Sequence, residues 1–414
     1  MRWLTFARVS SQRIGSLLAV VASGSDSRPT NLEGITRLYE PTLRHPVVIP
    51  PERAIHVHEY LNRQHLWERY RSLKKTDAAA IAGSEIQIQD LWLSDPSLPS
   101  ASGAITDRVL DEPPQLAAAL RLVRGENYTL TDRGKAFRLA GETEVTSIRE
   151  KNIDTNPFLL SSTSRLFSLW TFLEEDFDFL RASYAIQLDS LGSTFTRMDF
   201  AMRLDEACDQ LRQAWVRRVR TGKDRERLVR LAEIQEKIRD IRAEKDSGQL
   251  ATWGGGRTPD QLATIRLEPL VDIGLLGRAR FDYDYTISDA QRTFFTEMID
   301  SESANEFLDH RLFHAFLTAM EVEPTPIGKD EIWSRIKIAH AAVRSRLGYA
   351  SFKEVVVLAM SVMANERLGP CFELQDGIDV IQEQQKEQPR AVRFGVTRGG
   401  GLTYIKIAES AKGA

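Results

Sequence analysis

The chain has only two cysteines, Cys208 and Cys371, and they lie far apart in its 414 residues. Without closely spaced cysteines, neither a zinc ribbon nor a disulfide framework is expected, and this usage fits a reducing cytoplasm. No apolar run approaches the ~18 residues that a membrane-spanning helix needs, so no membrane partner is expected. Residues 17–22 form a short apolar run after Arg13 that only superficially resembles a signal peptide. These absences predict a cytoplasmic protein.

The chain also lacks a strong net charge, because it has 55 Lys and Arg residues and 58 Asp and Glu residues, which gives a formal net charge of -3. The chain is therefore no polycation that coats nucleic acid, and any contact with DNA must come from local basic patches. A hydrophobic content of 42% is ordinary for a globular protein. The length predicts two or three domains, each with its own core.

No catalytic constellation is recognisable. The segment 254–257 reads Gly-Gly-Gly-Arg and lacks the Lys-Ser/Thr of a phosphate-binding loop, and no nucleophile-elbow, kinase or dinucleotide signature occurs. His310 and His314 could share a helix face beside Asp309, but a metal site needs a further ligand, so a surface histidine pair is the simpler interpretation. We expect no metal, no cofactor and no catalysis, with an enzyme of unrecognised site as a minor alternative.

Most of the chain has the pattern of helices separated by breakers. Residues 24–52 are rich in Ser, Pro and Arg and predict an extended arm, and residues 51–75 predict a helix. The density of aromatic residues in 157–183 predicts a buried helical block. Residues 253–256, Trp-Gly-Gly-Gly, predict a joint.

Residues 197–247 predict a helical hairpin broken at 221–222. Past the break, apolar residues recur at three- and four-residue steps, which places them on one stripe of a helix. This seam, expected to pack against another helix in the chain or in a protein partner, is Leu228, Leu231, Ile234, Ile238 and Ile241. A homodimer is a further expectation.

The C-terminal part from residue 330 onward predicts helices followed by a β-hairpin. Two helices begin near Asp330 and Phe352, and a third spans 374–388. Alternating apolar residues then flank Arg-Gly-Gly-Gly at 398–401, which is typical of two strands joined by a glycine turn.

The most informative feature is an internal repeat. Residues 127–137 read NYTLTDRGKAF and match residues 284–294, DYTISDAQRTF, without a gap. In each copy a Tyr-Thr-Leu/Ile strand runs into a helix whose N-cap is Thr131 or Ser288. An aspartate follows in the first turn, where the helix dipole favours a negative charge. Tyr128 and Tyr285 should occupy equivalent strand positions.

The residues before each copy also agree. A helix over 259–272 precedes Ile-Gly-Leu-Leu at 273–276, with Gly274 as a C-cap, and a shorter helix over 115–124 precedes Gly125. The two copies differ at Gly134, where the second copy has Gln291, and the hairpin of the first copy is much shorter.

This pattern resembles the winged-helix superfamily over residues 105–142 and 258–298. In many of its members a recognition helix ends in Gly-Leu-Leu/Ile, and the last strand of the following wing hairpin reads Tyr-x-Leu-Thr before a further helix. The C-terminal segment could form a third such unit without the motif. The resemblance implies a mainly α fold with short β-hairpin wings, in tandem winged-helix-like domains with a helical-hairpin insertion.

We therefore expect five segments, which are an N-terminal arm and helix (1–75), a first winged-helix-like domain (76–145), a helical domain with the hairpin (146–252), a second winged-helix-like domain (253–300) and a C-terminal helical domain (301–414).

Basic residues gather in three sets that are expected to contact DNA phosphates. The set at the hairpin tip is Arg217, Arg218, Arg220, Lys223, Arg225 and Arg227. The set at the first repeat is Arg121, Arg124, Arg133 and Lys135, and the set at the second is Arg266, Arg278, Arg280 and Arg292.

The favoured interpretation is a non-catalytic DNA-binding protein that places helix 259–272 near a groove and its arginines on phosphates. Such a protein would serve as a subunit of a larger bacterial DNA-processing or antiviral defence complex. Two alternatives stay open, a scaffold subunit whose winged helices dock protein partners, and a transcriptional regulator. In the scaffold alternative the basic sets are solvated surface.

Overall fold

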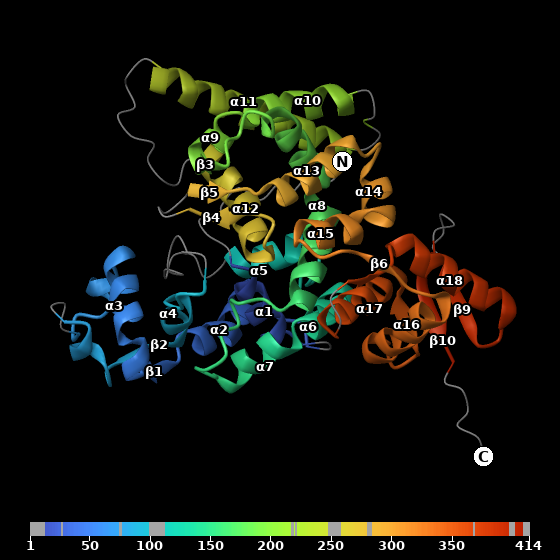
Figure 1. Ribbon diagram of the computed structural model, residues 1–414, viewed down its shortest axis with the longest axis horizontal. Helices are drawn as coiled ribbons and strands as arrows, with labels where there is room; N and C mark the ends of the chain where they lie inside the picture. The colour runs from blue at the N-terminus through green and yellow to red at the C-terminus, as the bar shows by residue number, and fades with distance from the viewer. Residues whose placement is uncertain are drawn as a thin grey trace.

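The protein is mainly helical in the computed structural model (Figure 1), which describes residues 13–25, 28–73, 77–98, 112–216, 219, 222–246, 258–279, 284–366, 369–396 and 402–408. Helix α8 (Ser162–Gln187) runs through the middle of the molecule. The N-terminal elements lie at one side of it, a helical hairpin lies at one end, and the C-terminal elements lie at the other side. Among the described helices, none has both the length and the apolar character that crossing a membrane would require.

The N-terminal part is organised around helix α1. Its elements are α1 (Ile14–Ser23), α2 (Leu32–Leu43), β1 (Pro46–Val48), α3 (Ala54–Arg63), β2 (Glu85–Gln87), α4 (Ile88–Leu93), α5 (Glu112–Ala119), α6 (Asp132–Ala140) and α7 (Glu142–Glu150). Residues 14–22 of α1 are all buried, and α1 packs against α2, α5, α6 and α7. The apolar run that superficially resembled a signal peptide is thus the core of this part.

Two expectations for the N-terminal part need correction. The predicted extended arm contains α2, whose N-cap Asn31 accepts a hydrogen bond from the Gly34 amide at 2.8 Å, and β1, which pairs antiparallel with β2. The predicted helix over 51–75 ends at Arg63, because His65 adopts a left-handed conformation (φ 53°) that an α-helix cannot contain.

The aromatic block is helix α8, as predicted. Its aromatic side chains Phe167, Trp170, Phe177 and Phe179 are fully buried. Helices α6, α10, α12, α13, α14 and α17 all pack on it, so α8 joins the N-terminal, hairpin and C-terminal parts into one body. Apolar residues surround α8 on nearly every side because it has neighbours on nearly every side.

The helical hairpin is also confirmed. It consists of α9 (Arg197–Ala201), α10 (Leu204–Val216) and α11 (Gly222–Asp246), at the top of Figure 1. Leu231, Ile234 and Ile238 of the predicted seam are buried, and Leu228 and Ile241 are half-buried. Helix α11 packs on α10, so the seam is covered within the chain.

The helical half of the repeat is confirmed in both copies. Thr131 accepts a hydrogen bond from the Gly134 amide at the start of α6, and Ser288 accepts one from the Gln291 amide at the start of α13 (Asp289–Asp300). Phe137 and Phe294, at matching positions of these helices, are buried.

The prediction that each copy begins with a strand is wrong for the first copy. Tyr285 lies in β5 (Asp284–Thr286), between two strands, whereas Tyr128 has a positive φ of 44° and lies in a turn. The turn arises because the Tyr128 amide donates to the Arg124 carbonyl at 2.7 Å. In place of the expected hairpin, the described residues of this copy form one isolated antiparallel bridge, between Val123 and Leu130.

The helix before each hairpin ends in the same way. Helix α12 (Thr258–Ile273) ends at Gly274 (φ 95°), where the Leu275 amide donates to the Leu270 carbonyl at 2.9 Å. Helix α5 ends early, and the Leu122 amide donates to the Ala117 carbonyl at 2.8 Å. The residue that takes the left-handed conformation there is Arg121 (φ 59°), not the predicted Gly125. From this residue to the N-cap, the first copy spans 121–131 and the second 274–288, so the second hairpin is four residues longer.

A strand from far upstream completes the sheet of the second copy. Strand β3 (Thr194–Thr196) pairs with β5, and β5 pairs with β4 (Gly277–Arg278), so the order is β3-β5-β4. The hairpin of α10 and α11 is thus inserted between β3 and α12. The structural unit around the second copy therefore draws on residues well before the expected start at 253.

The C-terminal part contains the predicted helices and strands. After α14 (Ala304–His310), α15 (Leu312–Ala319) and β6 (Thr325–Pro326), its elements are α16 (Lys329–Val343), β7 (Tyr349–Ser351), α17 (Phe352–Glu366), β8 (Pro370–Cys371), α18 (Leu374–Glu387), β9 (Val392–Val396) and β10 (Leu402–Ile407). The sheet order is β7-β10-β9. In both three-stranded sheets an earlier strand pairs with the second strand of a hairpin. The predicted glycine turn, 398–401, lies outside the described residues.

Candidate nucleic-acid interface

Helix α12, predicted to lie near a DNA groove, is enclosed by the protein. Every residue from 262 to 273 is buried, including Thr264, Arg266, Glu268 and Asp272. Helices α8, α9 and α11 pack on it, and Asp272 accepts the Ile14 amide at 2.8 Å and pairs with Arg13. Residues 262–273 present no exposed face that could reach base edges, so the expectation that helix 259–272 lies in a groove is corrected over this stretch.

The basic set at the second repeat is structural, which corrects the expectation of phosphate contacts there. The side chains of Arg266 and its partner Asp176 have no solvent exposure, with 2.8 Å between Nε and Oδ2. Burial alone would lower the pKa of Arg278, but the adjacent Glu268 carboxylate raises it above its ordinary value. Arg292 donates to the carbonyl oxygens of residues 188, 191 and 192 beyond the end of α8. Arg280 lies outside the described residues.

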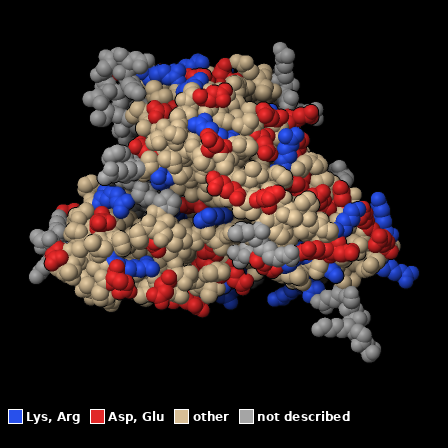
Figure 2. Space-filling model, in the orientation of Figure 1, with Lys and Arg blue, Asp and Glu red and all other residues tan. Residues whose placement is uncertain are grey.

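The hairpin-tip set is described only in part. Arg217, Arg218, Arg220 and the Lys223 side chain lie outside the described residues. Arg225 is exposed on α11 and Arg227 is half-buried there. Acidic side chains are interspersed on the same helix, as in the ion pair between Arg230 and Glu233 at 3.0 Å. Figure 2 shows the same intermingling of positive and negative side chains over the visible face of the molecule.

The basic set at the first repeat converges on an open cleft. Arg121, Arg124, Arg133 and Lys135 all line this cleft of about 580 Å³. Its opposite wall comes from the C-terminal sheet and helix α17, through Ser351, Glu354 and Tyr404. Of the three predicted sets, this is the one whose described members gather around a space that a ligand can enter.

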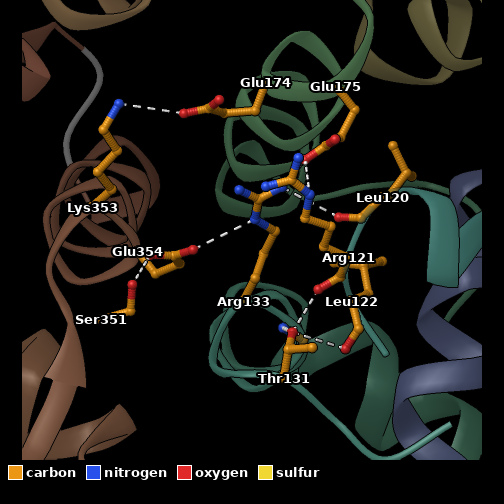
Figure 3. Close-up of polar contacts among 11 residues, drawn as sticks. Leu120, Arg121, Leu122, Thr131, Arg133, Glu174, Glu175, Ser351, Lys353 and Glu354 are labelled. Atoms are coloured by element: carbon orange, nitrogen blue, oxygen red, sulfur yellow. Dashed lines mark hydrogen bonds and ion pairs between the residues drawn. The ribbon is translucent and has the colours of Figure 1, made fainter. Parts of the chain in front are cut away.

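Arg133 forms the floor of the cleft (Figure 3). Its guanidinium lies between Glu175 of α8, at 2.7 Å, and Glu354 of α17, at 3.5 Å, and it also donates to the Leu120 carbonyl at 3.3 Å. The indole of Trp170 lies beneath it, with 4.8 Å between the guanidinium carbon and the ring centroid. Arg133 is therefore a buried cross-link between three parts of the chain, and its expected phosphate contact is corrected.

The same carboxylates fix the walls of the cleft. Glu175 also accepts Arg121 Nε at 3.0 Å, while Glu354 accepts the Ser351 hydroxyl (Figure 3). One residue before Glu354, Lys353 pairs with Glu174 at 3.4 Å and Asp309 at 3.3 Å. The first of these pairs joins α17 to α8 and the second joins α17 to α14, beside the cleft.

Positive charge remains at the rim. The Arg121 side chain is 68% exposed despite its bond to Glu175, and Arg124 is exposed on the turn. Lys135 lies 3.6 Å from Asp132, a surface pair that costs little to separate. The rim can therefore present two guanidinium groups and an ammonium to an anionic ligand such as a phosphate.

Sequence reasoning missed the opposite wall of this cleft. Ser351, Glu354 and Tyr404 lie more than 200 residues from the first repeat in the chain. No spacing rule joins them to the basic residues of that repeat.

A second, smaller pocket of about 240 Å³ contains the two histidines. His310, His314, Glu297 and Glu373 are among the residues that line it. Burial raises the pKa of Glu373 to about 7, although its carboxylate accepts the amides of residues 313 and 314. Within the described residues, no group of three or more His, Cys, Asp and Glu side chains is arranged to hold a metal ion.

No protein-family model matches the chain, and no curated protein or solved structure matches it at a significant level.

Proposed function

We propose that this chain is a non-catalytic nucleic-acid-binding protein that holds the phosphate backbone at the cleft between the first repeat and the C-terminal sheet. The observation that carries the proposal is the convergence of Arg121, Arg124 and Lys135 on the rim of that cleft. Exposed guanidinium groups and a half-buried ammonium around one space can neutralise successive phosphates and release their counterions.

We further propose that winged-helix units form the framework of the protein. Two observations support this. The two repeat copies share a helix, a left-handed C-cap, a paired segment and a capped helix in the same order. In the C-terminal part, helix α16, strand β7, helices α17 and α18 and a hairpin follow one another, and β7 pairs with the second hairpin strand.

Contact through the cleft favours binding that does not depend on base sequence. Phosphate contacts position a protein on nucleic acid, whereas base edges carry the sequence information. Because residues 262–273 are buried, α12 gives no support to reading of base edges, which also weighs against the transcriptional-regulator alternative. A subunit that grips nucleic acid within a larger bacterial DNA-processing or defence complex remains our proposal for its setting.

The test is a salt series of binding isotherms, measured by fluorescence anisotropy with labelled DNA. The triple variant Arg121→Ala/Arg124→Ala/Lys135→Ala should bind more weakly, and the log–log salt slope should fall by up to about 0.9 for each duplex phosphate that the variant no longer neutralises. A matched control removes three cations elsewhere, Arg37, Arg71 and Lys329, whose side chains are 67–81% exposed. If both triple variants behave alike, the cleft is not the binding site.

A second candidate function, protein docking, is favoured by the charge of α18. This helix exposes Asp376, Asp379 and Glu387, which would repel a phosphate backbone and would suit a basic protein surface. A scaffold subunit of this kind would fail to bind DNA in the salt series. It would also lose its partner in co-purification when Asp376 and Asp379 are replaced by Asn.

A further inference from the structure

The outer face of the C-terminal sheet carries aromatic and basic side chains together. In the register of β10, Tyr404 lies opposite Ser351 and Gly395, and Lys406 lies opposite Tyr349 and Arg393. Residues directly opposite one another in antiparallel strands point to the same face, so these side chains share one surface. We call Tyr349, Arg393, Tyr404 and Lys406 the sheet platform.

The inner face of the same sheet is apolar, which fixes the platform outward. Ile405 and Val392 are buried, and the Phe394 ring packs against Phe352 with 5.7 Å between centroids. A slip of one residue in β10 would exchange the buried and exposed sets, so the packing of Ile405 holds Tyr404 on the outside.

The platform is accessible and positively charged. Tyr404 and Tyr349 are 42% and 37% exposed to solvent. Arg393 is exposed, and the Lys406 ammonium lies 5.2 Å from the centroid of the Tyr349 ring. Tyr349 and Tyr404 are diagonal neighbours on adjacent strands, a relation that places Cβ atoms roughly 7–8 Å apart.

Tyr404 connects the platform to the cleft, because it also lines the cleft wall opposite the first repeat. A strand whose phosphates lie at Arg121 and Arg124 can thus place its bases over Tyr404 without leaving the protein surface. Arg393 and Lys406 extend the positive surface beyond the tyrosines.

We infer that the sheet platform and the cleft together form a binding site for single-stranded nucleic acid. This inference rests on the proposed function and names its ligand. Aromatic side chains on an open sheet, bordered by cations, stack unpaired bases and hold the backbone between them. A duplex keeps its bases paired and stacked inside, so the tyrosines add nothing to its binding.

The experiment compares a labelled oligothymidine of about 20 nucleotides with a duplex of the same length by fluorescence anisotropy. Tyr404→Ala should weaken oligothymidine binding roughly 5- to 150-fold and weaken duplex binding far less, because only unpaired bases stack on the ring. Tyr404→Phe keeps the ring and should bind like the unchanged protein. Leu347→Ala, at a side chain 76% exposed in the same part of the chain, is the matched control.

A second pair of variants tests the cations of the platform. Replacing Arg393 and Lys406 by Ala should lower the log–log salt slope for oligothymidine by about 0.7 for each phosphate that is no longer neutralised, whereas Tyr404→Ala should leave that slope unchanged. Circular dichroism on each variant checks that the sheet is intact.

The outcomes separate this inference from the proposed function. If Arg121→Ala/Arg124→Ala/Lys135→Ala weakens the binding of both duplex and oligothymidine but Tyr404→Ala weakens neither, the platform is refuted and the cleft proposal stands. If oligothymidine binding is lost in Tyr404→Ala yet survives Arg121→Ala/Arg124→Ala/Lys135→Ala, the platform binds single strands without the cleft, so the cleft proposal and the joint site are both refuted. If neither nucleic acid binds to the folded protein, both are refuted.

Discussion

Breaking the ion pair between Arg266 and Asp176 should destabilise the protein severely. The two side chains have no solvent exposure, and they join α12 to α8 through Nε–Oδ2 at 2.8 Å and Nη2–Oδ1 at 2.9 Å. Arg266 also donates to the Leu262 carbonyl at 3.0 Å and lies 3.9 Å from the centroid of the Phe179 ring. Two close contacts therefore join this guanidinium to this carboxylate inside the protein.

The expected loss of stability can be estimated from the charge that stays buried when Arg266 is replaced. Arg266→Met keeps an apolar stem of similar length but leaves the buried Asp176 carboxylate without the guanidinium charge beside it, which costs about 3–5 kcal/mol. The double variant Arg266→Met/Asp176→Leu removes both charges, and well-packed apolar replacements of a buried pair are often neutral or stabilising. We expect the double variant to recover most of the stability that the single variant loses.

Urea denaturation followed by tryptophan fluorescence measures this difference, since Trp170 lies on α8 itself. With a slope of about 3 kcal/mol per molar urea, the single variant should unfold at a urea concentration about 1 M lower or more. The structural role of Arg266 would be refuted if Arg266→Met kept the original midpoint while losing DNA affinity, as expected of a phosphate-binding residue.

Two further predictions concern the first repeat and the C-terminal part. Gly134→Ala should destabilise by about 1–3 kcal/mol, because a Cβ there would lie 1.9 Å from the Leu122 carbonyl oxygen, whereas Gly125→Ala meets nothing within 4 Å and should be nearly neutral in the same thermal melts. Because the pKa of Glu373 is raised in the folded state, its contribution to stability is complete below the ordinary value near 4.5 and is lost as the pH rises through about 7. Stability measured by urea titration at several pH values should therefore fall over this range by up to about 3 kcal/mol, and Glu373→Gln should flatten the curve. Burial lowers the pKa of His340, which makes stability rise with pH below about 6.5, so the difference between protein and variant isolates Glu373. An unchanged pH profile in Glu373→Gln would contradict the assignment.

Local sequence signals predicted helices and strands well where the interactions behind the signal lie within a single helix or hairpin. The N-caps at Thr131 and Ser288, the seam of α11 and the alternation in β9 all depend on neighbours within a few residues. The same signals could not show that Arg121, and not Gly125, takes the left-handed conformation, because the packing of α5 on α1 and α2 decides where that helix ends.

The candidate site was predictable only in part, for a related reason. The cations of the first repeat are visible in the sequence, and three of the four reach the rim of the cleft. The sequence carries no sign that Arg266, Arg278 and Arg292 are buried or bound to carbonyl oxygens, since their partners come from other elements. Arginine is as suited to such interior pairs as to phosphate, and only the tertiary structure separates the two uses.

The pairing of α1 with α12 also has a consequence for biosynthesis. Asp272 accepts the first amide of α1, at Ile14, across a separation of 258 residues. At about 5–20 residues per second, a ribosome needs roughly 13–50 s to deliver that carboxylate after Ile14 has been made. During this interval α1 can pack on α2, α5, α6 and α7 but lacks the carboxylate that accepts its first amide, so its N-terminal turn is completed only after α12 has been made.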